Sequence, residues 1–219
     1  VNPWIHDFAA YDFWAKPLGL LSLAALLRQA GAGVTVIDCL DRFHPSETRT
    51  PKILWDGRGP YRKTPIRTPP GLEGEKRVFS RYGIKPEWLE QDLLNLEQPD
   101  LVLVTSLMTY WAPGVAETIG AVKRIFPDVP VILGGVYASL LPEHARKHSG
   151  ADQVVTGPGE ALLNDLVRNA TGWDPGIDPA IISDNADLDR QPFPALDLLS
   201  HLAYAPVLTS RGCPFSCEY

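Results

Sequence analysis

The chain has 219 residues, which is enough for one domain and an appendage, and its formal net charge is −6. Its content of 45% hydrophobic and 21% charged residues is typical of a globular protein. The acidic balance argues against a nucleic-acid partner, and the longest apolar run, residues 18–27, is shorter than the roughly 20 residues of a membrane span. Three cysteines, Cys39, Cys213 and Cys217, make no disulfide framework and favour a reducing cytoplasm.

The first third of the chain predicts one helix, one strand and a long irregular stretch. Pro17 suits the first position of a helix over residues 17–30, and Gly31 supplies its stop. Residues 34–38 predict a short buried strand. Residues 42–85 are rich in Pro, Gly, Arg and Thr, which indicates an irregular insertion with a functional role.

The rest of the chain alternates between helices and buried strands. Helices are predicted at residues 86–96, 114–126, 142–148 and 160–170, and strands at 101–105, 131–133 and 153–156. Val1-Asn2-Pro3, which has no initiator methionine, is interpreted as the tail of one more strand, the first in the sheet, in a piece of a larger protein. This alternation predicts a Rossmann-like α/β fold, a doubly wound parallel sheet of about five strands in three α/β/α layers. We assign residues 1–170 to this domain and 171–205 to a linker.

Ligands of doubly wound sheets bind beyond the carboxyl ends of the strands, so the loops after the strands are the candidate site. Thr105 and Ser106 offer hydroxyls there. Gly134-Gly135 and Gly157-Pro158-Gly159-Glu160 let a ligand approach the backbone, and the second loop opens a helix. Two of these loops, residues 3–16 and 105–111, are rich in aromatic residues: Trp4, Phe8, Tyr11, Phe13 and Trp14 in one, and Tyr110 and Trp111 in the other. Glycines that leave room at the backbone, next to aromatic side chains, favour a large planar ligand. These aromatic residues could equally belong to the core or pack against a further domain.

The elements Thr105-Ser106-Leu107 and Gly134-Gly135, 26 residues apart, resemble the Ser-x-Leu and Gly-Gly elements of the B12-binding fold. The later glycine loop resembles the Gly-Glu-Gly-Glu turn of that family, with Pro158 as a departure. The resemblance implies that cobalamin places its dimethylbenzimidazole nucleotide tail here. The residues it implies for the cobalamin site are Thr105, Ser106, Leu107, Tyr110, Gly134, Gly135, Val136, Tyr137, Gly157, Gly159 and Glu160.

The Asp-x-His-x-x-Gly loop that supplies a lower-axial histidine in some members of the family is absent from this sequence. Asp41-Arg42-Phe43-His44 follows the wrong strand and lacks the glycine, and His6 lies in the right loop without the right context. We expect base-off cobalamin without a histidine ligand. His144 and His148 lie four residues apart, but with no third ligand a solvated helix face is favoured over a metal pair. Cys39 is interpreted as a small core residue.

The last residues, Arg211 to Tyr219, resemble the radical SAM signature Cys-x-x-x-Cys-x-aromatic-Cys without its third cysteine. The resemblance implies that Cys213 and Cys217 are two of three thiolate ligands of a [4Fe–4S] cluster that binds S-adenosylmethionine. Residues 206–219 would then begin a radical SAM barrel, with residues 206–209 as its first strand. The chain itself is expected to bind cobalamin as its small-molecule cofactor. The cluster and the chemistry are expected in the larger protein, a radical SAM enzyme.

The implied function is to hold cobalamin over the active site of a B12-dependent radical SAM enzyme, for methyl transfer to an unactivated carbon or a related radical reaction such as tetrapyrrole cyclisation. Two alternatives stay open. The domain could have lost cobalamin and serve as a scaffold or substrate-binding domain, in which case the Gly134 side of the sheet would be filled. It could instead be a non-enzymatic module for a nucleotide-like ligand.

Overall fold

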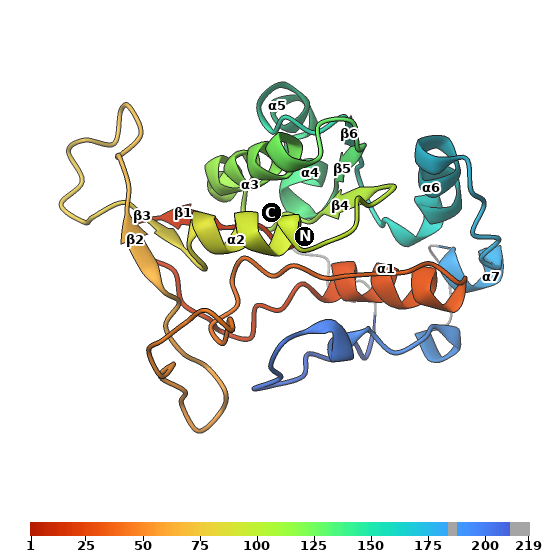
Figure 1. Ribbon diagram of the computed structural model, residues 1–219, viewed down its shortest axis with the longest axis horizontal. Coiled ribbons are helices and arrows are strands. Elements are labelled where there is room, and N and C mark those ends of the chain that lie inside the picture. Colours follow the sequence, from red (N-terminus) through yellow and green to blue (C-terminus); the bar gives the residue numbers. More distant parts are fainter. Residues whose placement is uncertain (184–187, 211–219) are drawn as a thin grey trace, which may run out of the picture.

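The computed structural model describes residues 1–183 and 188–210 and arranges them as an α/β core with a second sheet at one end (Figure 1). The strands are β1 Ile5–Asp7, β2 Lys63–Pro65, β3 Ser80–Tyr82, β4 Val102–Val104, β5 Val131–Leu133 and β6 Gln153–Val154. The helices are α1 Leu18–Gln29, α2 Pro86–Leu94, α3 Ala112–Ile125, α4 Val136–Leu140, α5 Pro142–His148, α6 Leu163–Thr171 and α7 Pro179–Ile182. Short 3-10 helices are η1 Thr109–Trp111, η2 Glu160–Leu162, η3 Leu188–Arg190 and η4 Leu196–Leu198.

The core sheet is parallel and has the order β4-β5-β6. Its side chains alternate between two helical layers, as expected for a strand covered on both faces. Val102, Val104 and Val131 pack with α2, α3 and α5, whereas Leu103 and Ile132 face α1 and α6. The predicted three-layer α/β/α arrangement is therefore present.

Two short segments extend this sheet beyond β4. The Val1 amino group donates to the Leu103 carbonyl at 2.6 Å, and the Thr105 amide donates to the Val1 carbonyl at 3.2 Å. On its other side Asn2 bridges Asp38 in parallel. The spatial order is thus residues 37–39, residues 1–2, β4, β5, β6, one of the usual orders of doubly wound sheets. Val1 and Asn2, predicted as the tail of the first strand in the sheet, therefore pair between residues 37–39 and β4.

The prediction of a strand over residues 34–38 was wrong in extent. The backbone pairs only where Asn2 lies beside it, with the Asn2 amide donating to the Ile37 carbonyl and the Cys39 amide donating to the Asn2 carbonyl, both at 2.9 Å. Residues 34–36 are not part of a strand and line a cavity.

The prediction that residues 42–85 are irregular was wrong in part. β2 and β3 lie in this stretch and join β1 in an antiparallel sheet of order β1-β3-β2, with Ile5 opposite Tyr82. Figure 1 shows this sheet at the far end of the molecule from α6. The strands have three residues each and pair over long sequence separations, so no periodicity marks them.

The segment predicted as a linker, residues 171–205, packs against the domain. It contains α7, η3 and η4, and in Figure 1 its later part runs along α1. Ile177 and Ile182 join Leu26 and Leu27 of α1 in one apolar cluster, and Ala195 packs on the same helix. We call residues 188–204 the strap. The strand expected at residues 206–209 is not formed. These residues belong to the described part of the chain and pair with no strand in it, and Val207 is 77% exposed.

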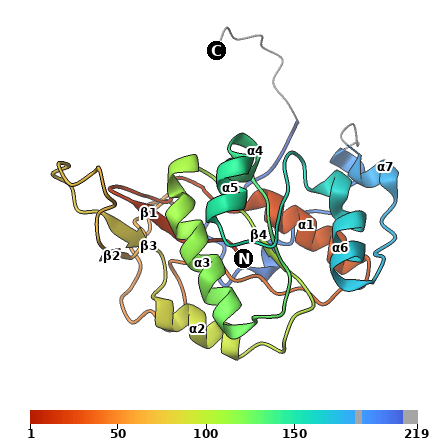
Figure 2. The same ribbon diagram turned by 90° about the horizontal axis from the view of Figure 1, so that it is seen from above.

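The helices agree with prediction to within a few residues, with two differences. The helix expected at 160–170 begins as η2 before continuing as α6, and two short helices were not predicted: α4, which follows Gly135 directly, and α7. Figure 2 shows α3, α4 and α5 grouped on one side of the core, away from α6. Within the described residues, no helix combines the length and apolar character needed to cross a membrane.

Candidate functional site

A cavity of about 230 Å³ lies at the carboxyl ends of the parallel strands. Its walls come from the ends of β4 and β5, the loop after β6, and the helices α1 and α6. It is lined by Gly19, Leu20, Leu23, Leu103, Val104, Thr105, Ile132, Gly134, Gly135, Val155, Gly157, Pro158, Gly159, Glu160, Leu163 and Leu166. Six of the sequence-predicted site residues are among them: Thr105, Gly134, Gly135, Gly157, Gly159 and Glu160.

Ser106 supports the glycine turn that forms one wall of the cavity. Its side chain is buried, and its hydroxyl donates to the Gly134 carbonyl at 2.6 Å. The Val136 amide donates to the Ser106 carbonyl at 2.8 Å, and the Ala138 amide reaches the Ser106 hydroxyl at 3.4 Å. Ser106 therefore holds the glycine turn in place and does not itself line the cavity.

The two glycines of the pair have different roles. A Cβ added to Gly135 would lie 2.3 Å from the Ser106 carbonyl oxygen, and the φ of Gly135 is +94°, so this position requires glycine. A Cβ added to Gly134 would meet no atom within 4 Å, although Gly134 lines the cavity. The missing side chain of Gly134 thus leaves open space on the ligand side.

The second glycine loop is tied to the first. The Ser139 hydroxyl donates to the Gly135 carbonyl at 2.9 Å and accepts a hydrogen bond from the Gly157 amide, also at 2.9 Å. Gly157 has a φ of +78°, and a Cβ on Gly159 would come within 3.3 Å of Leu23 in α1. The loops after β5 and β6 therefore form one connected rim.

The apolar wall opposite the glycines was missed by the sequence analysis. Leu20 and Leu23 of α1 and Leu163 and Leu166 of α6 supply it. One local signal was available: Gly19, in the first turn of α1, lines the cavity too, and a glycine inside a helix needs a packing or functional reason.

An exposed apolar surface adjoins these loops on η1 and α4, which contact one another. Its large side chains, all at least 41% exposed, are Leu107, Met108, Tyr110, Val136, Leu140 and Leu141. Three of them, Leu107, Tyr110 and Val136, were predicted for the cobalamin site. They lie outside the cavity lining and could contact only a ligand that extends beyond it.

Of two further residues that the sequence analysis singled out, Tyr137 departs from its predicted place and Cys39 does not. Tyr137 is fully buried in the main core, and its hydroxyl lies 2.8 Å from His144 Nδ1, so its side chain is turned away from the cavity. Cys39 is also fully buried, and burial raises the pKa of its thiol, which agrees with its interpretation as a core residue.

The aromatic residues predicted over residues 3–16 fall into two groups: Trp4 lies before β1, and the others lie in the loop between β1 and α1, the aromatic loop. Trp4 is buried in the main core and donates to the Ile84 carbonyl at 2.8 Å, so its ring is not available to contact a ligand. Phe13 and Trp14 remain about half exposed and share the guanidinium of Arg58, which lies 5.6 Å and 5.0 Å from their ring centres. Trp14 has a φ of +65°, an uncommon conformation for a bulky residue.

None of the five histidines, all within the described residues, lines the cavity. His6 Nε2 lies 2.8 Å from Glu117, and His44 Nε2 lies 3.0 Å from Asp92. His144 bonds Tyr137, the rings of His144 and His148 are in contact, and the ring of His201 contacts that of Phe43 at an angle of 38°. The expected cluster ligands, Cys213 and Cys217, lie outside the described residues.

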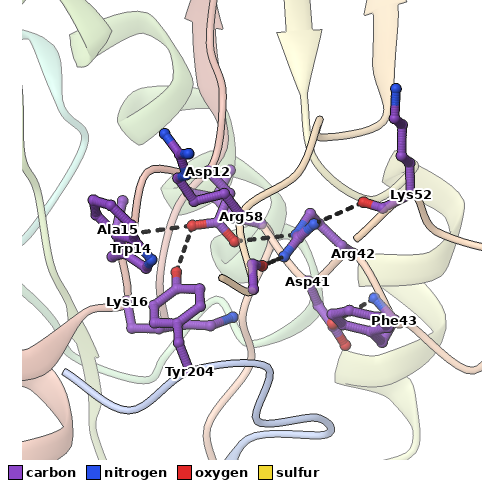
Figure 3. A network of polar contacts seen from close by, with 12 residues as sticks. Asp12, Trp14, Ala15, Lys16, Asp41, Arg42, Phe43, Lys52, Arg58 and Tyr204 are labelled. Atoms are coloured by element: carbon purple, nitrogen blue, oxygen red, sulfur yellow. Dashed lines mark hydrogen bonds and ion pairs between the residues drawn. The ribbon is translucent and has the colours of Figure 1, made fainter. Parts of the chain in front are cut away.

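A buried polar network connects the strap with the aromatic loop and the insertion (Figure 3). Arg42 Nε lies 3.0 Å from Asp12 Oδ2, and both side chains are at most 3% exposed. The remaining guanidinium nitrogens of Arg42 donate to the carbonyls of Lys52 and Gly57. Burial and the neighbouring Asp12 carboxylate raise the pKa of Tyr204, so the Tyr204 hydroxyl stays protonated and donates to Asp12.

Comparisons with known proteins agree with the geometry of the cavity. Residues 83–167 match the B12 binding domain family, so a B12-binding domain is found over β4, β5, β6 and their glycine loops. The chain is 29% identical over 144 residues to an uncharacterized methyltransferase of Pyrococcus horikoshii, covering 55% of this chain and 31% of the relative. It is 36% identical over 92 residues to an uncharacterized methyltransferase of Synechocystis, covering 41% of this chain and 17% of the relative. The chain thus spans less than a third of either relative, and no solved structure matches it.

Proposed function

We propose that this domain binds cobalamin with the dimethylbenzimidazole tail detached from cobalt and inserted into the 230 Å³ cavity. The observation that carries the proposal is the open space at Gly134, at the carboxyl end of the sheet in a region that matches the B12 binding domain. Gly134, Gly135, Gly157 and Gly159 would provide backbone clearance for the tail. Leu20, Leu23, Leu163 and Leu166 would provide its apolar wall.

The exposed surface of η1 and α4 would support the corrin ring. Leu107, Tyr110 and Val136 offer apolar area next to the cavity, where a ligand larger than the cavity would extend. Cobalamin would supply a cobalt centre able to carry a methyl group. The chain's own residues would bind and orient it, and without a histidine at the cavity the cobalt is expected to lack a protein imidazole ligand.

The proposal extends to a catalytic partner domain of the radical SAM class. Two features support this part: the Cys213-x-x-x-Cys217 spacing and the methyltransferase names of the two relatives. In the larger protein, Cys213→Ser or Cys217→Ser should abolish the electron paramagnetic resonance signal of a reduced [4Fe–4S] cluster and leave cobalamin binding unchanged. A full cluster signal in both variants would contradict the radical SAM assignment.

The cofactor assignment is tested by anaerobic titration with hydroxocobalamin, followed by visible absorption and calorimetry. Stoichiometric binding is expected, and Gly134→Leu should weaken it by at least about tenfold because the leucine occupies the tail cavity. Gly74→Leu is the matched control, since a Cβ there also meets nothing within 4 Å but the residue lies in the insertion. Equal affinity of the Gly134→Leu variant and the control would overturn the assignment and favour the scaffold alternative.

A further inference from the structure

A cavity of about 460 Å³, twice the volume of the proposed cofactor cavity, lies between the strap and the domain. We call it the strap cavity. It is bounded by Lys16 and by residues of four segments, 35–38, 41–45, 92–96 and 197–201. No described residue lines both this cavity and the cofactor cavity, so a ligand here would not compete with cobalamin.

The ammonium group of Lys16 lies in this cavity with few partners. The side chain is only 8% exposed, and Nζ lies 3.5 Å from Asp38 Oδ2, which is longer than most hydrogen bonds of this kind. Its other contact among the described residues is the ring of Tyr204, whose centre lies 5.9 Å from Nζ (Figure 3). An ammonium has three N–H donors, so at least two donors of Lys16 are buried without an acceptor atom.

The neighbouring carboxylate of Asp38 is bonded on one side only. Its Oδ1 accepts from the Asn2 side-chain amide at 2.7 Å and from the Leu40 amide at 2.9 Å. Within the described residues, Oδ2 accepts only the long contact from Lys16. Unused donors and an unused acceptor therefore lie side by side. A vicinal diol matches this pair, because one hydroxyl can accept from the ammonium while its neighbour donates to the carboxylate.

The other charged groups of the lining limit the charge of a ligand. Asp41 and Asp92 add two carboxylates, whereas Asp197 is paired with Arg28 at 2.7 Å. His44 accepts a backbone amide at Nδ1 and lies 3.0 Å from Asp92 through Nε2, so it is a neutral donor and supplies no cation. Three carboxylates thus face one ammonium, which disfavours a phosphate or carboxylate ligand.

The cavity also has an apolar part. Ile37, Leu96 and Leu198 contribute aliphatic side chains to its lining. Small-molecule sites combine an apolar lining with a few polar groups that fix the orientation of the ligand. A ligand that suits this lining carries a flat apolar group next to its diol and has no anionic group.

We propose that the strap cavity binds a neutral ribonucleoside, with the diol of its ribose on Lys16 and Asp38 and its base against Ile37, Leu96 and Leu198. A free sugar would offer the same diol but would leave the apolar side chains without a partner. Because residues 197–201 belong to the strap, the bound nucleoside would also hold the strap on the domain.

The test is a calorimetric titration of the chain, without cobalamin, with adenosine, 2′-deoxyadenosine, adenosine monophosphate and ribose. Adenosine is expected to bind, and 2′-deoxyadenosine should bind at least about tenfold more weakly because it leaves a buried polar group unpaired. Adenosine monophosphate should also bind about tenfold more weakly at low salt. Equal affinity for adenosine and 2′-deoxyadenosine, ribose binding as tight as adenosine, or no adenosine binding up to about 5 mM would overturn the proposal.

Lys16→Met removes the ammonium and should weaken adenosine binding by at least about tenfold. Lys63→Met, an exposed position on β2, is the matched control and should bind as the unaltered chain does. Unchanged affinity of Lys16→Met would overturn the proposal. If that variant does not fold, the comparison of adenosine with 2′-deoxyadenosine on the unaltered chain decides.

Limited proteolysis locates the bound nucleoside. Saturating adenosine should slow cleavage within residues 188–204, and unchanged cleavage would place the nucleoside elsewhere and overturn the proposal. None of these measurements needs cobalamin, so a failed cobalamin titration would count against the proposed function alone.

Discussion

Gly134 and Gly135 are adjacent in sequence, yet the structure has room for a Cβ at Gly134 and none at Gly135. Gly135→Ala should lower the free energy of unfolding by at least about 2 kcal/mol, because a φ of +94° and the Ser106 carbonyl at 2.3 Å both oppose a Cβ. Gly134→Ala should change it by less than about 1 kcal/mol, since its Cβ meets open space. Urea unfolding of both variants measures the difference, and similar losses for the two would show that the turn has a different geometry.

At the scale of elements, the strap depends on charges buried where it meets the loops of the domain. Arg42→Met leaves the Asp12 carboxylate buried without its cation and should destabilise the protein by about 3–5 kcal/mol. Arg28→Met, which removes an exposed ion pair between α1 and Asp197 of the strap, should cost less than about 1 kcal/mol.

Both variants are compared with the unaltered chain by thermal and urea unfolding, and limited proteolysis reports the strap separately. Faster cleavage within residues 188–204 is expected for Arg42→Met, because Tyr204 is held by the same Asp12. If Arg28→Met were the more damaging change, surface pairing and not the buried network would hold the strap.

At the scale of the whole molecule, ligand binding should stabilise the fold as well as occupy the cavity. The cavity is formed by α1, α6, the ends of β4 and β5, and the loop after β6, which are far apart in sequence, so it exists only in the folded state. At about 100 times its dissociation constant, cobalamin should add about 2.7 kcal/mol and raise the unfolding midpoint by about 5–10 °C.

Differential scanning calorimetry measures this shift, with the Gly134→Leu variant as the control that should lack it. In the same complex, the cobalt(II) electron paramagnetic resonance spectrum should show no hyperfine splitting from a protein imidazole nitrogen. Such splitting would show that a histidine moves to the cobalt from its observed position.

The sequence by itself determined the features that have local signals. Apolar β-branched runs marked β4 and β5, Pro17 and Gly31 delimited α1 to within one or two residues, and glycine pairs after strands indicated the loops of the site. The reason is that strand burial, helix ends and backbone clearance each restrict the residue types at a few neighbouring positions.

Only the tertiary structure decided the features that depend on distant contacts. It showed that Ser106 supports the glycine turn from behind, that α1 and α6 form the wall opposite the glycines, and that β2 and β3 pair with β1. It also turned a predicted linker into a strap on α1. These contacts join residues tens of positions apart, and their short strands and single polar side chains leave no periodic pattern, so the sequence carries no local signal from which they could be predicted.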